Sequence, residues 1–437
     1  MKVYCFKIEF GRLVAPILTL VIGGNHESSN YFSELPNGGW LCPNIYYMGR
    51  SGVVQFGGLR IGALSGIYKP HDYQKGHYEQ LPLNDSTMRS IYHTRELDVF
   101  KLLALNSGGN NANGEARQKE KNRLDIVFSH DWPQGIVNYG DKNKLYQVKN
   151  HLAQDGDDLG SPAGMLVLRE LKPRYWFSAH LHVKYAAIYP HPDNTTTKFL
   201  ALDKVLPNRD FLQILDFEVQ PNRQQQQPQQ EQQQQQQQNQ QLKLQYDVEW
   251  LSILYNTKSI TDNHKNHYNT PLSRDLFKNL YTDEDLKNID NRFIEINKLR
   301  QSIDDKNHDN SENNESVENI SNHHLEIPFN FIENTHAYDP SNPNRMDLNF
   351  IYPSTYENPQ NIVLNNLLDV VCSKESIPIN IDTLTKLDTE TYRKDLQDHT
   401  TPNQQQQSFN NNNNNETTTT TNEEEQANQQ VISPKLI

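Results

Sequence analysis

The sequence predicts an α/β protein, built as a layered β-sandwich with flanking helices, followed by a smaller C-terminal domain and by disordered Gln- and Asn-rich segments. Two observations predict this class. Through the first half of the chain, short β-rich runs alternate with helical patterns, which is typical of a layered α/β domain. Farther along, tracts of Gln, Asn and Thr lower the apolar content of the 437 residues to 35%, and such tracts cannot bury a core.

Each predicted element has a local signal. Four β-rich or buried apolar runs end at small or polar residues and predict strands at 16–22, 59–67, 124–128 and 175–178. Helical patterns predict two helices, at 94–105 and 162–171. The second has Ser161 as its N-cap, Pro162 in its first turn and Pro173 beyond its end.

Changes of composition divide the chain. The first domain covers 14–219 and is interrupted by a Gly- and Asn-rich surface loop at 106–122. A Gln-rich linker follows at 220–241. The C-terminal domain covers 242–398, with a disordered acidic stretch at 302–322, and a disordered tail covers 399–437.

Composition also excludes several classes of protein. Three cysteines cannot form a disulfide framework, which indicates a reducing compartment. The apolar run 13–22 is far shorter than the roughly 20 residues that cross a bilayer, so we interpret it as a buried strand rather than a signal peptide. Residues 1–210 carry 24 basic and 20 acidic residues, a surplus too small to indicate nucleic acid by itself; most of the net charge of −13 comes from the acidic remainder.

Metal-ligand side chains follow three of the predicted strands. Asn25 and His26 lie in GGNHE, His130 in SHDW, and His180 and His182 in SAHLH. Because strand ends of a layered α/β sheet meet at one edge, these groups can converge. An extended HxH pair would point both imidazoles the same way, toward one metal or two neighbouring ones. Imidazole with an amide oxygen suits Mn, Fe or Zn, and two such ions can cleave a phosphodiester.

Each motif alone has a plainer interpretation. A single His after a strand is more often a hydrogen-bonded structural residue, GGNHE can be a turn, and HxH is a weak signal. The three motifs in this order at strand ends, with GALSG at 62–66 between them, favour a metal site.

Longer stretches carry a more specific resemblance. GNHE, SHDW and HLH resemble motifs of the calcineurin-like metallophosphoesterase superfamily. IGGNHESSNYFSELPNGGWLCPNIYYMG (22–49), SGIYKPHDYQKGHYE (65–79), FSHDWPQGI (128–136) and GSPAGMLVLRELKPRYWFSAHLHVKYAA (160–187) resemble the RNA lariat debranching enzyme family. So do TKFLALDKVLPNRDFLQIL (197–215) and QYDVEWLSILY (245–255), the second of which opens that family's C-terminal domain. The resemblance covers about 14–300.

This resemblance implies hydrolysis of the 2′–5′ phosphodiester at the branch point of excised intron lariats, in mRNA processing and intron turnover. Asn25, His130 and His180 would ligate one metal, and His182 would belong to a second. His26 would lie beside the scissile phosphate, as a transition-state stabiliser or a proton donor to the leaving oxygen. Two divalent ions per site, Fe²⁺, Zn²⁺ or Mn²⁺, are expected for a complete chain.

The segment 69–95 matches the family's lariat-recognition loop. Its aromatic and basic side chains suit stacking on bases and contacts with phosphates. The predicted substrate-binding residues are Lys69, His71, Tyr73, Lys75, His77, Arg89 and Tyr92. Tyr78 and Arg95 offer the same chemistry. The plainer alternative is an exposed aromatic and basic loop without a function.

The N-terminus departs from the family pattern. The family's first strands supply a metal-ligand pair and a bridging carboxylate, whereas residues 1–24 contain neither His nor Asp. We therefore expect an N-terminally incomplete chain. The alternatives are a catalytically impaired remnant that binds lariat RNA or splicing factors, or another metallophosphoesterase. The expected partners are branched intron lariat RNA and splicing or intron-turnover factors, with no membrane, and the expected location is the nucleus.

Overall fold

The computed structural model describes residues 15–27, 32–80, 83–106, 123–217, 242–308, 325–328, 358–375 and 377–386. The predicted linker at 220–241, the predicted tail at 399–437 and nearly all of the predicted loop at 106–122 lie outside the described residues.

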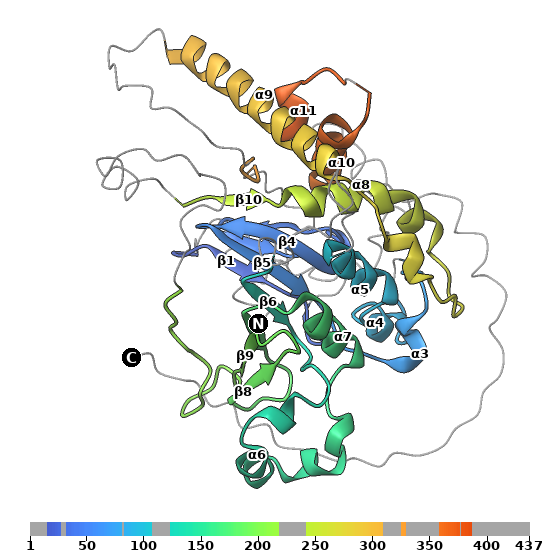
Figure 1. The fold of residues 1–437 in the computed structure, drawn as a ribbon, viewed down its shortest axis with the longest axis vertical. Helices are drawn as coiled ribbons and strands as arrows, with labels where there is room; N and C mark the ends of the chain where they lie inside the picture. The colour runs from blue at the N-terminus through green and yellow to red at the C-terminus, as the bar shows by residue number, and fades with distance from the viewer. Residues whose placement is uncertain are drawn as a thin grey trace, which may run out of the picture.

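A seven-stranded sheet runs through the molecule in the order β10-β4-β5-β6-β7-β9-β8 (Figure 1). Its central strands β5, β6, β7 and β9 are parallel, whereas β10, β4 and β8 pair antiparallel with their neighbours. The strands are β4 (Ser51–Phe56), β5 (Leu59–Leu64), β6 (Ile126–Ser129), β7 (Tyr175–Ser178), β8 (Tyr185–Pro190), β9 (Thr196–Ala201) and β10 (Leu244–Tyr246).

A second sheet of three strands has the order β1-β3-β2, with β1 at Thr19–Val21, β2 at Gly39–Cys42 and β3 at Ile45–Tyr47. One apolar cluster joins the two sheets, because Trp40 and Tyr46 of the small sheet belong to the same buried cluster as Val54, Ile61 and Ile126 of the large one. Neighbouring residues of a strand point to opposite faces, so Val53 belongs to the other core. The predicted strand 16–22 is present as the shorter β1, which belongs to the small sheet.

Helices form the third layer. They cover the face of the large sheet to which the side chain of Val53 points. Here α5 (Glu96–Leu103), α7 (Pro162–Leu171) and α8 (Val248–Asn263) contribute to the second buried cluster. The predicted cap is present, since the Ser161 hydroxyl accepts a hydrogen bond from the Gly164 amide at 3.0 Å. Short helical segments lie at α3 (Pro70–Tyr73), α4 (Thr87–Ser90), α6 (Lys142–Val148), η1 (Ala104–Asn106), η3 (Ile136–Tyr139), η4 (Asn150–Gln154), η5 (Gly156–Asp158) and η8 (Arg274–Phe277). The α/β class with flanking helices is confirmed.

The C-terminal part packs on the β4 end of the large sheet, whereas α6 lies at the opposite end of the molecule (Figure 1). It adds β10 to that sheet and contributes α9 (Asp283–His308), α10 (Pro359–Cys372) and α11 (Ile381–Thr385) besides α8. Helix α9 continues to His308 and so enters the stretch 302–322 that we expected to be disordered. The buried side chains of Phe293 and Ile296 anchor this helix. Among the described residues, no helix is long and apolar enough to span a bilayer.

Candidate metal centre

The GGNHE segment leaves β1 and crosses to the end of the large sheet. The Gly23 amide donates to the Ser65 hydroxyl at 3.0 Å, and the Gly66 amide donates to the Gly23 carbonyl at 2.8 Å. A Cβ on Gly24 would lie 2.5 Å from Cε1 of His130, closer than side-chain atoms approach. Glycine is therefore required at position 24 for the backbone to pass so near the imidazole of His130.

Three ligand-type atoms meet at this crossing. His130 follows β6 and His180 follows β7, its parallel neighbour, so the two imidazoles leave adjacent strand ends. Nε2 of His130 lies 2.9 Å from Oδ1 of Asn25 and 3.1 Å from Nδ1 of His180. The structure therefore brings together Asn25, His130 and His180, which the sequence predicted to share one metal.

The turn that carries His180 and His182 differs from the extended pair we expected. Both residues adopt left-handed backbone conformations, with φ of 58° and 54°. Such angles are uncommon for residues other than glycine and often mark functional positions. The indole of Trp132 stabilises the turn by donating to the Ala179 carbonyl at 2.8 Å. The expectation that an extended HxH would align both imidazoles was therefore wrong.

Histidine His182 is not part of the three-atom group. Among the described residues, one group of three His, Cys, Asp or Glu side chains has all its ligand atoms within 4.8 Å of one another. That group is His71, Asp72 and His93, so His182 does not form such a group with His130 and His180. His182 is half-buried, and its carbonyl accepts a hydrogen bond from Arg209. The donor set of two imidazoles and one carboxamide oxygen thus fits one transition-metal ion, and His182 is available to a second.

Burial and mutual repulsion keep the imidazoles neutral. Burial, followed by the nearby His180, His182 and His26, lowers the pKa of His130 to about 3. Burial also lowers the pKa of His180, although the charge of Asp131 opposes it. A metal binds the unprotonated imidazole, so both side chains are in the form that a metal requires.

We expect the affinity of this centre for Mn²⁺ to change little between pH 8 and pH 6. An ordinary imidazole with a pKa of about 6.5 would take a proton over this range and release the metal. Because the pKa of His130 is lowered to about 3, protons compete with the metal there only in more acidic solution. Calorimetric titration at both pH values measures this, and a roughly tenfold loss of affinity at pH 6 would contradict it.

Two carboxylates that we had not assigned shape the centre. Oε2 of Glu27 accepts hydrogen bonds from the amides of Gly24 at 2.8 Å and His26 at 3.2 Å, which folds the segment so that the His26 side chain is exposed. Asp131 accepts from the amides of Tyr68 and Trp132, both at 3.1 Å. Burial nevertheless raises the pKa of Asp131. Both residues adjoin the predicted ligands in sequence, and this adjacency was the only signal for them.

The predicted recognition segment is only partly exposed. Lys69, His71 and Arg89 are exposed, and Tyr92 is half-buried. The side chain of His77 is 7% exposed, and its Nε2 lies 2.8 Å from Oδ2 of Asp98. This segment therefore combines a solvent-facing part with a buried part that packs against α5.

The remaining predicted side chains of this segment have partners within the fold. Lys75 donates to Asp72 at 2.9 Å, and the ring of Tyr73 lies 5.3 Å from that of Tyr68. Arg95, which we expected to contact phosphate, is fully buried and pairs with Glu79 at 2.6 Å. The composition of the segment 69–95 suggested an exposed loop. Instead, ion pairs hold the side chains of Lys75 and Arg95 within the fold.

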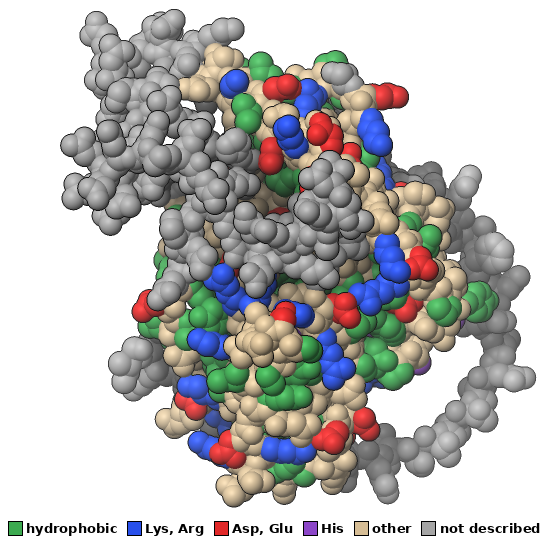
Figure 2. All heavy atoms as spheres, in the orientation of Figure 1, with side chains coloured by type: hydrophobic (Ala, Val, Ile, Leu, Met, Phe, Trp, Pro, Cys, Tyr) green, Lys and Arg blue, Asp and Glu red, His purple; other side chains and the backbone are tan. Residues whose placement is uncertain are grey.

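The charged residues on the face drawn in Figure 2 are of both signs and interspersed, and histidine is visible only at one margin. The His-rich centre therefore does not open on this face, and mixed charge there favours no single kind of charged partner.

A family model and curated relatives both show similarity to lariat debranching enzymes. The family model "Lariat debranching enzyme, C-terminal domain" matches residues 194–372. Lariat debranching enzyme A of Xenopus laevis is 41% identical over 363 residues, which covers 80% of this chain and 57% of that protein. The human lariat debranching enzyme is 41% identical over 349 residues, with 77% and 53% covered. The Arabidopsis thaliana enzyme is 45% identical over 258 residues, with 58% and 54% covered.

The chain spans a little over half the length of these curated relatives. Identity of about 40% over most of the chain is joined by the family-model match in its C-terminal part. Over most of its length the chain is therefore similar to lariat debranching enzymes, and its C-terminal part matches that family's model.

Proposed function

We propose that this protein is a metal-dependent phosphodiesterase that hydrolyses the 2′–5′ linkage at the branch point of intron lariat RNA. The observation that carries the proposal is the meeting of Asn25 Oδ1, His130 Nε2 and His180 Nδ1 beside the exposed His26. Neutral nitrogen and oxygen donors with an exposed imidazole next to them suit phosphodiester hydrolysis. Similarity to lariat debranching enzymes supports the choice of substrate.

In this proposal the residues of the chain have separate roles. Asn25, His130 and His180 hold a divalent ion, which supplies positive charge to the phosphoryl oxygens and an activated water. Glu27 fixes the segment by accepting from two amides, so that His26 faces the substrate. His26 then donates a proton to the leaving 2′ oxygen or stabilises charge on the phosphate.

Further parts of the proposal concern the metals, the domains and the cellular setting. The ions are Fe²⁺, Zn²⁺ or Mn²⁺, with His182 serving a second ion. Residues 14–219 form the phosphoesterase domain and 242–398 the C-terminal domain. Lys69, His71, Arg89 and Tyr92 contact the RNA around the branch. Because the proposed substrate is a product of splicing, we propose that the protein acts in the nucleus, together with splicing or intron-turnover factors.

The test uses a short branched oligoribonucleotide and a linear one of the same sequence, with Mn²⁺ present. We expect cleavage of the 2′–5′ linkage alone, and a fall of about 10²–10⁴-fold in the rate for His26→Ala, because a positioned acid contributes that much. His151→Ala is the matched control, since His151 is exposed on η4. Equal cleavage of the linear oligonucleotide would contradict the substrate, and an unchanged rate in His26→Ala would contradict the role of His26.

A further inference from the structure

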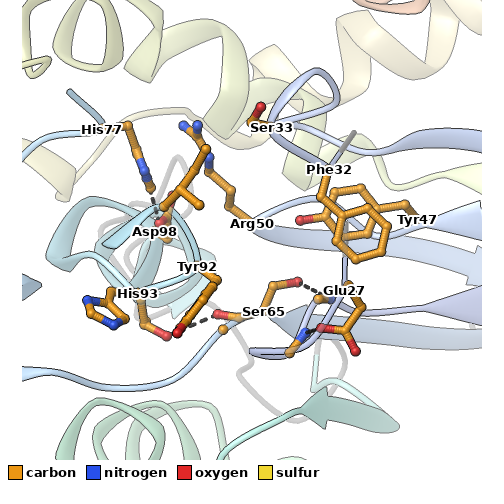
Figure 3. A pocket seen from close by; sticks show the side chains of 15 residues that line it. Glu27, Phe32, Ser33, Tyr47, Arg50, Ser65, His77, Tyr92, His93 and Asp98 are labelled. Atoms are coloured by element: carbon orange, nitrogen blue, oxygen red, sulfur yellow. Dashed lines mark hydrogen bonds and ion pairs between the residues drawn. The ribbon is translucent and has the colours of Figure 1, made fainter. Parts of the chain in front are cut away.

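A pocket adjoins the GGNHE segment, and His130 is not among the residues that line it. Gly23, Gly24 and Glu27 form one wall. The others come from Arg50 just before β4, from 65–66 just after β5, from 91–94, and from the side chains of Phe32, Ser33, Tyr47, His77 and Asp98. It holds about 460 Å³ of empty space, counting the part open to solvent. Figure 3 shows Arg50 extending toward His77 and Asp98 on one side of the pocket, with the rings of Phe32 and Tyr47 on the other.

Arg50 stands out among the polar residues of this pocket. Its backbone is fixed, because its amide donates to the Pro36 carbonyl and its carbonyl accepts from the Ser65 amide, both at 2.9 Å. Its guanidinium has no hydrogen-bond or ion-pair partner among the described residues, although the side chain is half-buried. Burial lowers the pKa of Arg50, although the charge of Asp98 opposes this.

Several other polar groups of the wall are already engaged within the protein, although the buried Nδ1 of His77 has no hydrogen-bond partner among the described residues. Asp98 lies 2.8 Å from the imidazole of His77. The hydroxyl of Ser65 donates to the Gly49 carbonyl at 2.6 Å, and that of Thr94 donates to the Ser65 carbonyl at 3.0 Å. The charge of Asp98 attracts Arg50 but makes no ion pair with it, and burial still lowers the pKa of the guanidinium. A partly buried cation without a direct ion pair costs free energy, so this guanidinium favours an anionic ligand.

Aromatic faces accompany the free guanidinium. The rings of Phe32 and Tyr47 stack with centroids 4.3 Å apart, and Tyr92 contributes a third ring to the wall. A guanidinium that donates to phosphate and aromatic rings in the same pocket form a combination that proteins use for single-stranded nucleotides. The same Gly23–Glu27 backbone forms both the wall of this pocket and the segment of His26, so one ligand can reach both.

We propose that Arg50 binds a second phosphate of the substrate, the one that adjoins the scissile phosphate in the RNA chain, and that the pocket receives that nucleotide. The identity of the ligand as RNA rests on the proposed function. Arg50 lies outside every motif that predicted the site, and no role in the chemistry is assigned to it.

The test uses the full chain. Two separate variants each remove one positive charge, one in the pocket and one on the exposed surface. Arg50→Gln removes the charge from the pocket, Arg50→Lys retains it, and Lys258→Gln removes a charge from the exposed surface of α8. Binding of the branched oligoribonucleotide is measured in EDTA, so that cleavage does not interfere, at several salt concentrations. Melting temperatures check the fold; we expect only a small change in Arg50→Gln, because its guanidinium makes no hydrogen bond or ion pair among the described residues and loses only the longer-range attraction of Asp98.

For Arg50→Gln we expect affinity about ten- to a hundredfold weaker, as for the loss of a charged hydrogen bond. We also expect the slope of log affinity against log salt to fall by about 0.7, which corresponds to one phosphate contact in a single strand. Lys258→Gln should bind with nearly the affinity and slope of the unaltered chain, and Arg50→Lys should keep its slope. Unaltered affinity and slope in Arg50→Gln would overturn the proposal.

Adenosine monophosphate separates this proposal from the proposed function, because it carries a phosphate but no branch. We expect it to raise the melting temperature of the unaltered chain and of Arg50→Lys, and not that of Arg50→Gln. If branched RNA is not cleaved but this pattern holds, the phosphate site stands and the debranching function fails. If the nucleotide stabilises Arg50→Gln as much as the unaltered chain, the phosphate site is refuted.

Discussion

Replacing His130 with alanine is expected to abolish tight metal binding and to lower the rate of phosphodiester cleavage roughly a thousandfold, because a bound ion supplies several kcal/mol of transition-state stabilisation. His130 is the centre of the ligand group, since its Nε2 lies 2.9 Å from Asn25 Oδ1 and 3.1 Å from His180 Nδ1. Alanine would leave two ligands that no longer surround a common point. Metal content after dialysis and the cleavage rate measure the two effects.

His151→Ala is again the control, because it removes an exposed imidazole on η4. Circular dichroism should show that both variants are folded. If His130→Ala retained its metal and more than about a tenth of the rate, His130 would not be a ligand of the ion used in the reaction.

Replacing Arg60 with leucine is expected to destabilise the protein by about 3–5 kcal/mol, because it removes the cation that pairs with two buried carboxylates. The guanidinium of Arg60 lies 2.6 Å from Asp247 and 2.6 Å from Glu249. The side chains of these two acids are only 2% and 5% exposed. This cluster joins β5 of the large sheet to the start of α8, so its loss should separate the C-terminal part from the sheet. Denaturant unfolding measures the effect.

The pH dependence of this effect follows from Asp247. Burial by itself would raise the pKa of Asp247, but the charge of Arg60 outweighs burial and holds that pKa below its ordinary value. The carboxylate therefore contributes stability above the unfolded pKa of about 3.9, and this contribution is lost as the pH falls below it. In Arg60→Leu the largest opposing effect is gone, although the hydrogen bonds from Trp250 and Gln55 remain, so burial raises the pKa of Asp247 relative to the unaltered protein. Protonation of Asp247 in acid then lowers the cost of burying this carboxyl group. The difference between the two proteins should therefore shrink as the pH falls from 7 to 4.

Arg274→Leu is the matched control for Arg60→Leu. Arg274 lies 2.9 Å from Glu170, but the two side chains are 43% and 40% exposed. Exposed pairs contribute about 0–1 kcal/mol, so this variant should unfold nearly like the unaltered protein. Equal destabilisation by both substitutions would show that burial of the Arg60 cluster is not what matters.

The parts of the fold with local signals could be predicted from the sequence. Helix α7 has a Ser cap and a flanking proline at each end, and β6 and β7 are short buried apolar runs that end at the ligand motifs. By contrast, β10 pairs with β4, which lies far away in the sequence, and no local pattern indicates such a partner. That β1 belongs to the small sheet follows from packing between sheets, which the residues of β1 alone do not show.

The candidate site likewise has features that sequence motifs predict and features that depend on tertiary contacts. Asn25, His130 and His180 lie in motifs whose chemistry can be recognised, and the predicted convergence of these three agrees with the structure. The left-handed backbone at His180 and His182 depends on a turn stabilised by Trp132, so an extended HxH was the wrong local geometry. The burial of His77 depends on Asp98, a tertiary contact that composition does not reveal. Arg50 has no motif, and only the pocket around it indicates a role.

The most direct test of the central claim is a crystal structure of the full chain grown with Zn²⁺, with anomalous diffraction recorded at the zinc edge. We expect an anomalous peak about 2.0–2.2 Å from Nε2 of His130, Nδ1 of His180 and Oδ1 of Asn25. A peak bound elsewhere, or none at this position while zinc is present in the crystal, would contradict the account.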